Sequence, residues 1–177
     1  MAIPRKYLVD DSTLGFYHCI SRCVRRAFLC GDDPLTGHNC DHRKEWLENR
    51  MLALASLFSV GLFAYAVMSN HYHFVLSIDP LAPLQWFDSE VAERWLMAYP
   101  CRLDNPGLEQ QRELKKQAIM ADKNKLKKYR QRLGSLSWFM SRLNEPLAKT
   151  SNVEDNASGR FWDRFLRPAK TAYITSM

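Results

Sequence analysis

Two histidines separated by one residue, His71 and His73, stand in the segment MSNHYHFVL. Apolar and more polar side chains alternate over residues 71–78, which predicts a strand whose successive side chains point to opposite faces. Tyr72 then faces the core, and both histidines face away from it. Their backbone positions are about 7 Å apart on a strand, within reach of one cation. The spacing alone also fits two ordinary half-exposed strand histidines.

A second group of potential metal ligands lies in the segment CGDDPLTGHNCDH. Cysteine and histidine are the usual zinc ligands, and the segment offers Cys30, His38, Cys40 and His42. It contains no Cys-x-x-Cys pair, so ordinary loop and core roles are the alternative. The chain has five cysteines at irregular spacing, a pattern that favours reduced thiols over a disulfide framework.

Length and composition predict one domain covering residues 1–177. The chain is 46% hydrophobic and 25% charged, which is enough apolar material for a proper core. No apolar run approaches the ~18–20 residues that cross a bilayer, and the N-terminus lacks the hydrophobic region of a signal peptide. We therefore expect a cytoplasmic protein with no membrane partner.

The positive charge of the chain is concentrated in one segment. Residues 109–132 contain nine basic and three acidic residues, so they account for the whole net charge of +6. A concentrated basic patch is typical of nucleic-acid binders, although a lysine-rich helix is also often only a solvated face. In the first interpretation, residues 112–132, including Lys127 and Lys128, contact DNA.

The order of the expected elements is strand, helix, strand, strand and then further helices. Residues 16–24, FYHCISRCV, predict a strand, and two more strands, LFAYAVM and residues 71–78, are joined by a tight turn at Ser69-Asn70. Helices are expected at residues 41–60, 88–99, 107–132 with a break near Ala121-Asp122, and 136–150.

This order predicts an α+β fold, a ferredoxin-like antiparallel sheet with helices packed on it, extended by extra C-terminal helices. In a split βαβ arrangement the first strand lies beside the third. His18 would then approach His71 and His73 as an additional ligand. A basic cluster that can bind phosphate would lie beside them, formed by Arg22, Arg25 and Arg26.

Several segments together resemble one protein family. AYAVMSNHYHFVL resembles the HUH motif segment of the single-tyrosine transposases, specifically the REP-associated tyrosine transposases of bacteria. YHCISRCVRRAFL resembles the first strand of that family. SLSWFMSRLNEPLAK and GRFWDRF resemble its later helix and the Gly-Arg-Phe-Trp segment that follows. The motifs occur in the family's order over about residues 16–165.

The resemblance implies a transposase that cleaves and rejoins single-stranded or hairpin DNA. His71 and His73 would help to hold a divalent cation, Mg²⁺ or Mn²⁺, that polarises the scissile phosphate. A tyrosine on a C-terminal helix would attack, giving a 5′-phosphotyrosine link and a free 3′-OH. A phenol with a pKa near 10 is a poor nucleophile at neutral pH, and a metal ion can stabilise the developing charge.

The C-terminal segment departs from the family pattern. The chain has Tyr173 in RFLRPAKTAYITSM, earlier than the family places its nucleophile and without the Asn-Pro element that follows it there. We expect a C-terminus that is truncated relative to the family and lacks the family's nucleophile, and Tyr173 is the only candidate that this segment offers for the role. A non-catalytic DNA-binding remnant is the alternative. In GRFWDRFLR, Trp162 and Arg164 are candidate DNA contacts, because single-strand binders combine cationic and aromatic side chains.

Overall fold

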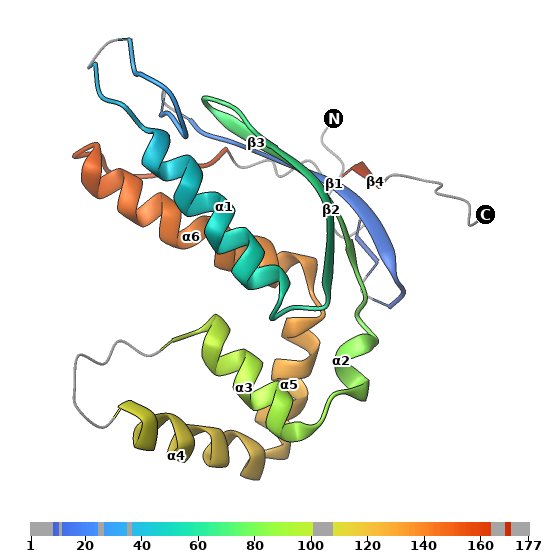
Figure 1. Cartoon of the computed structure of the whole chain (residues 1–177). Helices are drawn as coiled ribbons and strands as arrows, with labels where there is room; N and C mark the ends of the chain where they lie inside the picture. Colours follow the sequence, from blue (N-terminus) through green and yellow to red (C-terminus); the bar gives the residue numbers. More distant parts are fainter. Residues whose placement is uncertain are drawn as a thin grey trace.

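A four-stranded antiparallel sheet organises the molecule (Figure 1). The computed structural model describes residues 9–10, 12–24, 27–34, 37–100, 108–163 and 169–170. The strands are β1 (Gly15–Arg22), β2 (Val60–Val67), β3 (His71–Ile78) and β4 (Ala169–Lys170), in the order β2-β3-β1-β4. The first strand therefore lies beside the third, as the sequence predicts, and the expected α+β fold is confirmed.

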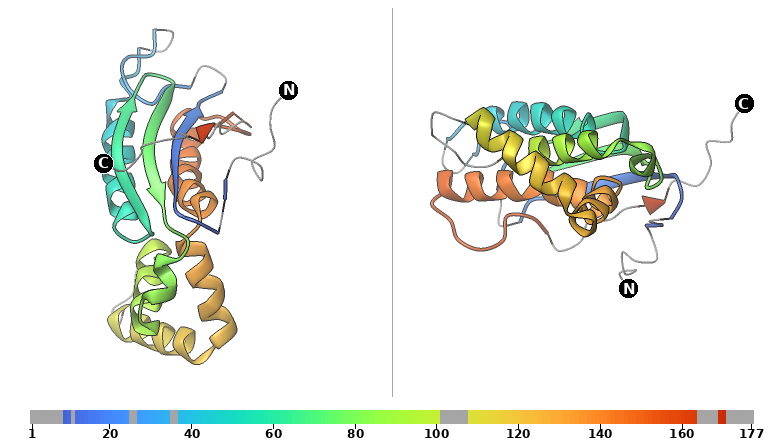
Figure 2. Two further views of the ribbon diagram at one scale, coloured as in Figure 1. Left: turned by 90° about the vertical axis from the view of Figure 1, so that its right-hand side faces the viewer. Right: turned by 90° about the horizontal axis from the view of Figure 1, so that it is seen from below.

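The helices form two groups around this sheet. Helices α1 (Asp41–Ala55) and α6 (Leu136–Glu154) lie side by side against one face (Figures 1 and 2). Beyond one end of the sheet lies a helical lobe that consists of α2 (Ala82–Gln85), α3 (Asp88–Ala98), α4 (Leu108–Ala121) and α5 (Lys123–Leu133). Within the described residues, we find no helix with the length and hydropathy that a bilayer crossing requires.

The core lies between the sheet and the α1/α6 layer. Every second residue of β3 is buried, from Tyr72 to Ile78, whereas the residues between them are half-buried. Strand β1 alternates in the same way, with Tyr17 and Cys19 fully buried. From the helix side, α1 and α6 contribute apolar stripes that include Leu47, Met51, Leu54, Phe139, Leu143 and Leu147. The predicted assignment of faces for residues 71–78 is therefore correct.

The break between α4 and α5 has a clear local cause. Asp122 leaves the helical backbone conformation, and its side chain accepts a hydrogen bond of 2.9 Å from the backbone N–H of Lys125. This contact satisfies one of the free N–H groups at the start of a helix. The predicted break near Ala121-Asp122 is therefore confirmed, and Asp122 starts a new helix in a different direction (Figure 1).

A small network of buried polar side chains connects α6 to the two central strands. The Tyr72 hydroxyl donates to Oδ1 of Asn144 at 2.7 Å, and Nδ2 of Asn144 donates to Oγ of Ser21 at 3.3 Å. All three side chains are buried. Trp162 adds a further bond from its indole N–H to the Asn144 carbonyl oxygen at 2.9 Å. Each buried polar group in this network therefore has a partner, as a stable core requires.

Replacing Asn144 by leucine tests how much this network stabilises the fold. The variant leaves the Tyr72 hydroxyl and Ser21 Oγ without their shared partner, so we expect a loss of about 1–3 kcal/mol in the free energy of unfolding. Urea denaturation measures the loss. Asn124→Leu, on the exposed surface of α5, is the matched control and is expected to change stability by less than about 0.5 kcal/mol. Equal effects for the two variants would contradict a stabilising role of the network.

Candidate functional site

Strand pairing brings three histidines together on the sheet. In the β1/β3 register, Ile20 lies opposite His73, and Arg22 lies opposite His71. The His18 and His73 rings are stacked with centroids 5.0 Å apart, and the His71 and His73 centroids are 5.1 Å apart. Nε2 of His18 lies 2.8 Å from Nδ1 of His73. His18, His71 and His73 are called the histidine cluster below.

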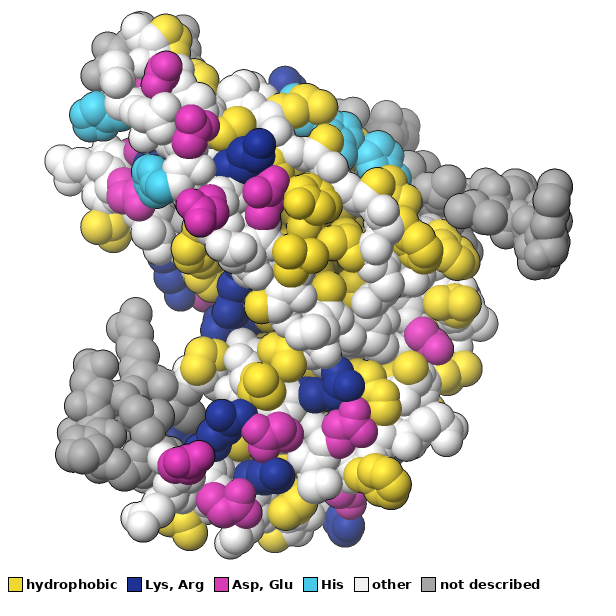
Figure 3. Space-filling model, viewed as in Figure 1, with side chains coloured by type: hydrophobic (Ala, Val, Ile, Leu, Met, Phe, Trp, Pro, Cys, Tyr) yellow, Lys and Arg dark blue, Asp and Glu magenta, His cyan; other side chains and the backbone are white. Residues whose placement is uncertain are grey.

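The histidine cluster lies on the face of the sheet that α1 and α6 do not cover. Its members alternate with the buried residues of β1 and β3, and the left view of Figure 2 shows this open face with both helices behind it. On the neighbouring strand, Ala66 pairs with His73 and Ala64 with Val75, so small side chains lie opposite these two residues. In Figure 3, histidine side chains lie at the sheet beside exposed hydrophobic residues.

Hydrogen bonds orient two of the imidazole rings. Nδ1 of His71 is 2.7 Å from the amide oxygen of Asn70. Because that oxygen can only accept, His71 carries its hydrogen on Nδ1, and its Nε2 has a free lone pair. When Nδ1 of His73 donates to His18, the Nε2 atom of His73 is free in the same way. Neighbouring groups that bind Nδ1 commonly fix the tautomer of metal-ligating histidines.

Electrostatics favour the neutral form of the central ring. Burial lowers the pKa of His73, and the neighbouring His18 and His71 lower it further because a second positive charge there would be repelled. Neutral imidazole is the form that binds metal ions. Arg22 lies at the end of β1, opposite His71, and its side chain is exposed. The histidine cluster therefore combines a central imidazole whose neutral form is favoured with an adjacent permanent cation.

The nitrogen atoms of the histidine cluster can supply part of the coordination shell of a metal ion. Among the residues that the structure describes, no group of three or more His, Cys, Asp or Glu side chains is arranged to hold a metal ion. His71 and His73 thus offer two nitrogens, and His18 is placed to orient His73. Mg²⁺ commonly keeps water ligands and binds substrate phosphates, and Mn²⁺ accepts similar ligands. The pair fits such an ion if water and phosphate oxygens complete the shell.

The basic segment does not join the histidine cluster. Helix α5 lies in the helical lobe, beyond the opposite end of the sheet from the β2–β3 turn (Figure 1). Much of its charge, and that of α4, is paired with acidic residues of α3. The ion pairs are Arg112 and Lys116 with Glu93, and Lys123 and Arg130 with Asp88. Lys127 and Lys128 are exposed and have no ion pair with a described residue.

The remaining predicted DNA contacts are only partly described. Trp162 is half-buried, with its ring edge-on to Tyr72 at 5.6 Å and its indole N–H bonded within the core. Its contacts are those of a packing residue, so a contact with DNA stays a prediction for its exposed part. Arg25, Arg26, Arg164 and Tyr173 lie outside the described residues.

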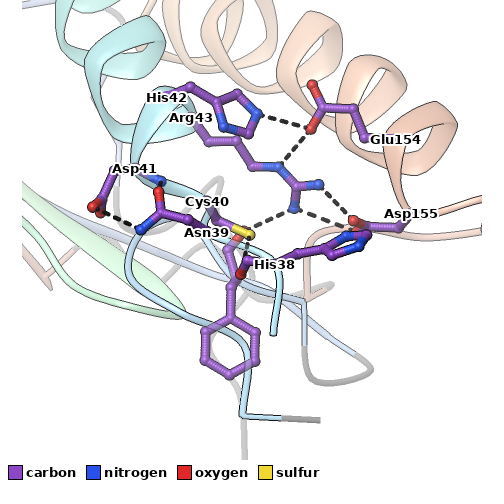
Figure 4. Close-up of polar contacts among 9 residues, drawn as sticks. His38, Asn39, Cys40, Asp41, His42, Arg43, Glu154 and Asp155 are labelled. Carbon is purple, nitrogen blue, oxygen red and sulfur yellow. Dashed lines mark hydrogen bonds and ion pairs between the residues drawn. The ribbon is translucent and has the colours of Figure 1, made fainter. Parts of the chain in front are cut away.

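The segment that offered a possible zinc site lines a cavity of about 930 Å³ near the end of α6. Figure 4 shows its polar contacts. His42 faces Glu154, with Nε2 and the carboxylate 3.1 Å apart, and the Cys40 thiol faces the carbonyl oxygen of His38 at 3.9 Å. These side chains bind protein groups instead of converging on one point. The described residues therefore give no support to the zinc interpretation.

The centre of this region is Arg43, which is only 4% exposed. Its guanidinium bonds to Glu154 at 2.7 Å and to Asp155 at 2.5 Å, and it also donates to the Phe28 carbonyl oxygen at 3.0 Å. Arg43 therefore joins the start of α1 to the end of α6 and to the loop after β1. One feature of the sequence indicates that Arg43 is buried. It lies four positions before Leu47, so it is in line with the apolar stripe of α1.

Replacing Arg43 by methionine should leave two facing carboxylates without their cation. We expect a loss of about 2–4 kcal/mol in unfolding free energy, less than for a fully buried pair because each carboxylate side chain is 34% exposed. The measurement is chemical denaturation. Lys44→Met removes the same charge from the exposed side of α1 and should change stability by less than about 0.5 kcal/mol. Similar losses in both variants would show that the ion pairs contribute nothing specific.

We compared this chain with protein-family models, with curated proteins and with solved structures, and no match was found. The family resemblance of the sequence motifs therefore stays a prediction. The arrangement of two oriented imidazoles beside an arginine, on an open sheet face, is independent of that resemblance.

Proposed function

We propose that this protein is a transposase-like enzyme that binds single-stranded or hairpin DNA on the open face of its sheet. The DNA would be cleaved and rejoined with the help of a divalent cation, Mg²⁺ or Mn²⁺. The observation that carries the proposal is the orientation of the His71/His73 pair: each Nδ1 has a hydrogen-bond partner, Asn70 or His18. In the tautomer in which Nδ1 of His73 donates to His18, both Nε2 atoms are available.

In this proposal His71 and His73 hold the cation, and His18 and Asn70 keep their rings in position. The bound ion would polarise the scissile phosphate as a Lewis acid. Arg22 would contact a phosphate oxygen beside it, because a guanidinium can donate two parallel hydrogen bonds to a phosphate. Arg25, Arg26 and Arg164 are proposed as further phosphate contacts, and Lys127 and Lys128 as contacts for a DNA segment that reaches the helical lobe.

The open face also offers aromatic side chains for stacking. The rings of Phe16 on β1 and Phe63 on β2 have centroids 5.7 Å apart, and Phe63 is 60% exposed. Phe63 lies at an irregularity of β2, between the residues where the β2/β3 register shifts. Exposed aromatic rings beside cationic groups favour single-stranded DNA, because every base can stack and no base pair must be read.

The proposed chemical step uses a tyrosine oxygen as nucleophile. The oxygen loses its proton and attacks phosphorus, and the bond from phosphorus to the 3′ oxygen breaks. The 3′ oxygen takes up one proton, so the products are a 5′-phosphotyrosine and a 3′-OH, with no net change in protons. Tyr17 and Tyr72 are fully buried, and burial raises the pKa of Tyr72 far above its ordinary value. Both are therefore unsuited to attack DNA. Tyr173 is the proposed nucleophile, and a protein that binds DNA without cleaving it is the alternative.

Removing both proposed ligands should abolish metal binding without unfolding the protein. His71 and His73 point away from the core, so the His71→Ala/His73→Ala variant should lose Mn²⁺ binding in calorimetry while its Tm stays nearly unchanged. The matched control is His38→Ala/His42→Ala, which removes two histidines elsewhere and should keep Mn²⁺ binding. If the first variant unfolds, or if both bind Mn²⁺ like the parent chain, the histidine cluster is not a metal site.

DNA binding on this face should depend strongly on salt, because each phosphate contact releases counterions. The logarithm of the affinity for a labelled single strand should fall with the logarithm of the salt concentration, with a slope of about −0.7 per neutralised phosphate. Arg22→Gln removes one phosphate contact, so it should reduce the magnitude of the slope by about 0.7. Lys149→Gln, an exposed lysine paired with Glu145 on α6, is the control that should leave the slope unchanged. A flat salt dependence of the parent chain would rule out this mode of binding.

A labelled DNA hairpin also distinguishes an enzyme that cleaves DNA from a protein that only binds it. The test is incubation with a labelled hairpin and Mn²⁺, followed by a denaturing gel: an enzyme that uses Tyr173 gives a covalent adduct that Tyr173→Phe abolishes. Salt-dependent binding without any adduct would establish the non-catalytic alternative. An adduct that survives in Tyr173→Phe would assign the nucleophile to another tyrosine.

A further inference from the structure

The cavity beside Arg43 has the size of a ligand-binding pocket. Its volume of about 930 Å³ lies within the range of about 300–1,000 Å³ that is usual for small-molecule sites. Its walls come from the loop after β1, the start of α1 and the end of α6, and they combine apolar with polar side chains. The apolar residues include Ala27, Phe28 and Ala157, and the amides are those of Asn39, Asn152 and Asn156. Such a lining suits a flat ring whose edges form hydrogen bonds.

One carboxylate of this lining, that of Glu154, is held in place but keeps an unused acceptor atom. Nε of Arg43 and Nε2 of His42 both contact Oε2 of Glu154, at 2.7 and 3.1 Å, as Figure 4 shows. Oε1 of Glu154 has no hydrogen-bond partner among the described residues, and the side chain is 34% exposed. Because the two contacts at Oε2 orient the carboxylate, Oε1 is a preformed acceptor on a residue that lines the cavity.

The charges of the lining disfavour a phosphate as the ligand. Asp33, Glu154 and Asp155 line the cavity together with one arginine, Arg43, which already bonds to the last two of these carboxylates and to a carbonyl oxygen. A phosphate would meet more negative than positive charge and would be repelled. A neutral group that donates hydrogen bonds is favoured instead, because hydrogen bonds to an ionised carboxylate are among the strong ones.

A backbone hydrogen bond connects the wall of the cavity to the turn that orients His71. The carbonyl oxygen of Asn70, whose side chain contacts Nδ1 of His71, accepts from the N–H of Cys23 at 2.8 Å. The next residue, Val24, lines the cavity, and Arg22, which precedes Cys23 at the end of β1, is exposed. The cavity therefore lies at the same end of the sheet as the histidine cluster. A DNA strand with one phosphate on Arg22 has a neighbouring base within reach of the cavity.

We propose that this cavity binds one unpaired DNA base that carries an amino group. Adenine, cytosine and guanine each have such a group, and thymine has none. The amino group would donate to Oε1 of Glu154, and the half-buried Phe28 would contact the face of the ring, as aromatic side chains do with unstacked bases. The inference rests on the proposed function and adds base specificity to a site that otherwise contacts phosphates and stacks rings.

Labelled strands of deoxycytidine and deoxyuridine, equal in length, give the sharpest test, because uracil has a carbonyl oxygen where cytosine has its amino group. The parent chain should bind the deoxycytidine strand about tenfold more tightly, as expected for one hydrogen bond to a charged group. Glu154→Gln should reverse the preference. Arg43 only donates, so it retains the amide oxygen, and the amide NH₂ group then matches the uracil oxygen. Glu145→Gln, an exposed position on the same helix, should keep the parent preference.

A second variant blocks the cavity without changing the contacts of Arg43, and it decides the question if Glu154→Gln does not fold. Ala157 lines the cavity and is exposed, so Ala157→Trp should fold and should bind both strands with equal affinity. Its binding should stay salt-dependent, because the phosphate contacts of the open face are unchanged. Ala53→Trp, at an exposed position of α1, is the control that should keep the parent preference. The Tm of each variant shows whether it is folded.

Two results would overturn the inference while the proposed function stands: equal affinity of the parent chain for the two strands, or a preference that a folded Glu154→Gln or Ala157→Trp variant leaves unchanged. If neither strand binds, the proposed function fails, and calorimetry with free deoxycytidine then decides about the cavity. Binding to the parent chain but not to Ala157→Trp would retain the base site, with a free nucleoside as its ligand. No binding to the parent chain would overturn the base site as well.

Discussion

The hydrogen-bonded register between β1 and β3 determines which side chains can meet on the open face. With Ile20 opposite His73 and Arg22 opposite His71, His18 lies diagonally across from His73 and contacts it. A shift of one residue would move the whole set of side chains on one strand to the other face. The histidine cluster would then disperse, and Tyr72 would leave the core. The register is therefore a condition for both the site and the core.

The core side of the sheet supports the same arrangement. Tyr72 lies between the two histidines in sequence and points the opposite way, where its hydroxyl binds Asn144 of α6. Because Asn144 also binds Ser21 of β1, one buried amide connects the two strands that carry the histidine cluster. Buried polar contacts of this kind are satisfied in only a few arrangements. The network thus helps to define the packing of α6 on the strands that present the cluster.

Local features of the chain could be predicted because each has a local cause. Alternation over residues 71–78 identified the faces of β3, and the capping chemistry of Asp122 marked the break between α4 and α5. Contacts between distant residues could not be predicted in detail. That β1 would lie beside β3 followed from the expected topology, but the 2.8 Å contact of His18 with His73 depends on the exact register. The contacts of Arg43 with the end of α6 likewise depend on how two helices pack.

The distribution of charge also could not be predicted from the sequence alone. Counted along the chain, the excess lies in residues 109–132, yet Glu93 and Asp88 of α3 neutralise part of it in space. Two arginines of α1 differ in their partners: Arg43 bonds to two carboxylates, whereas Nε and Nη2 of Arg50 have no acceptor among the described residues. The residue type is the same for both arginines, and so, at a spacing of seven residues, is nearly the side of the helix. Only the packing of α6 against α1 therefore decides which of them finds carboxylates.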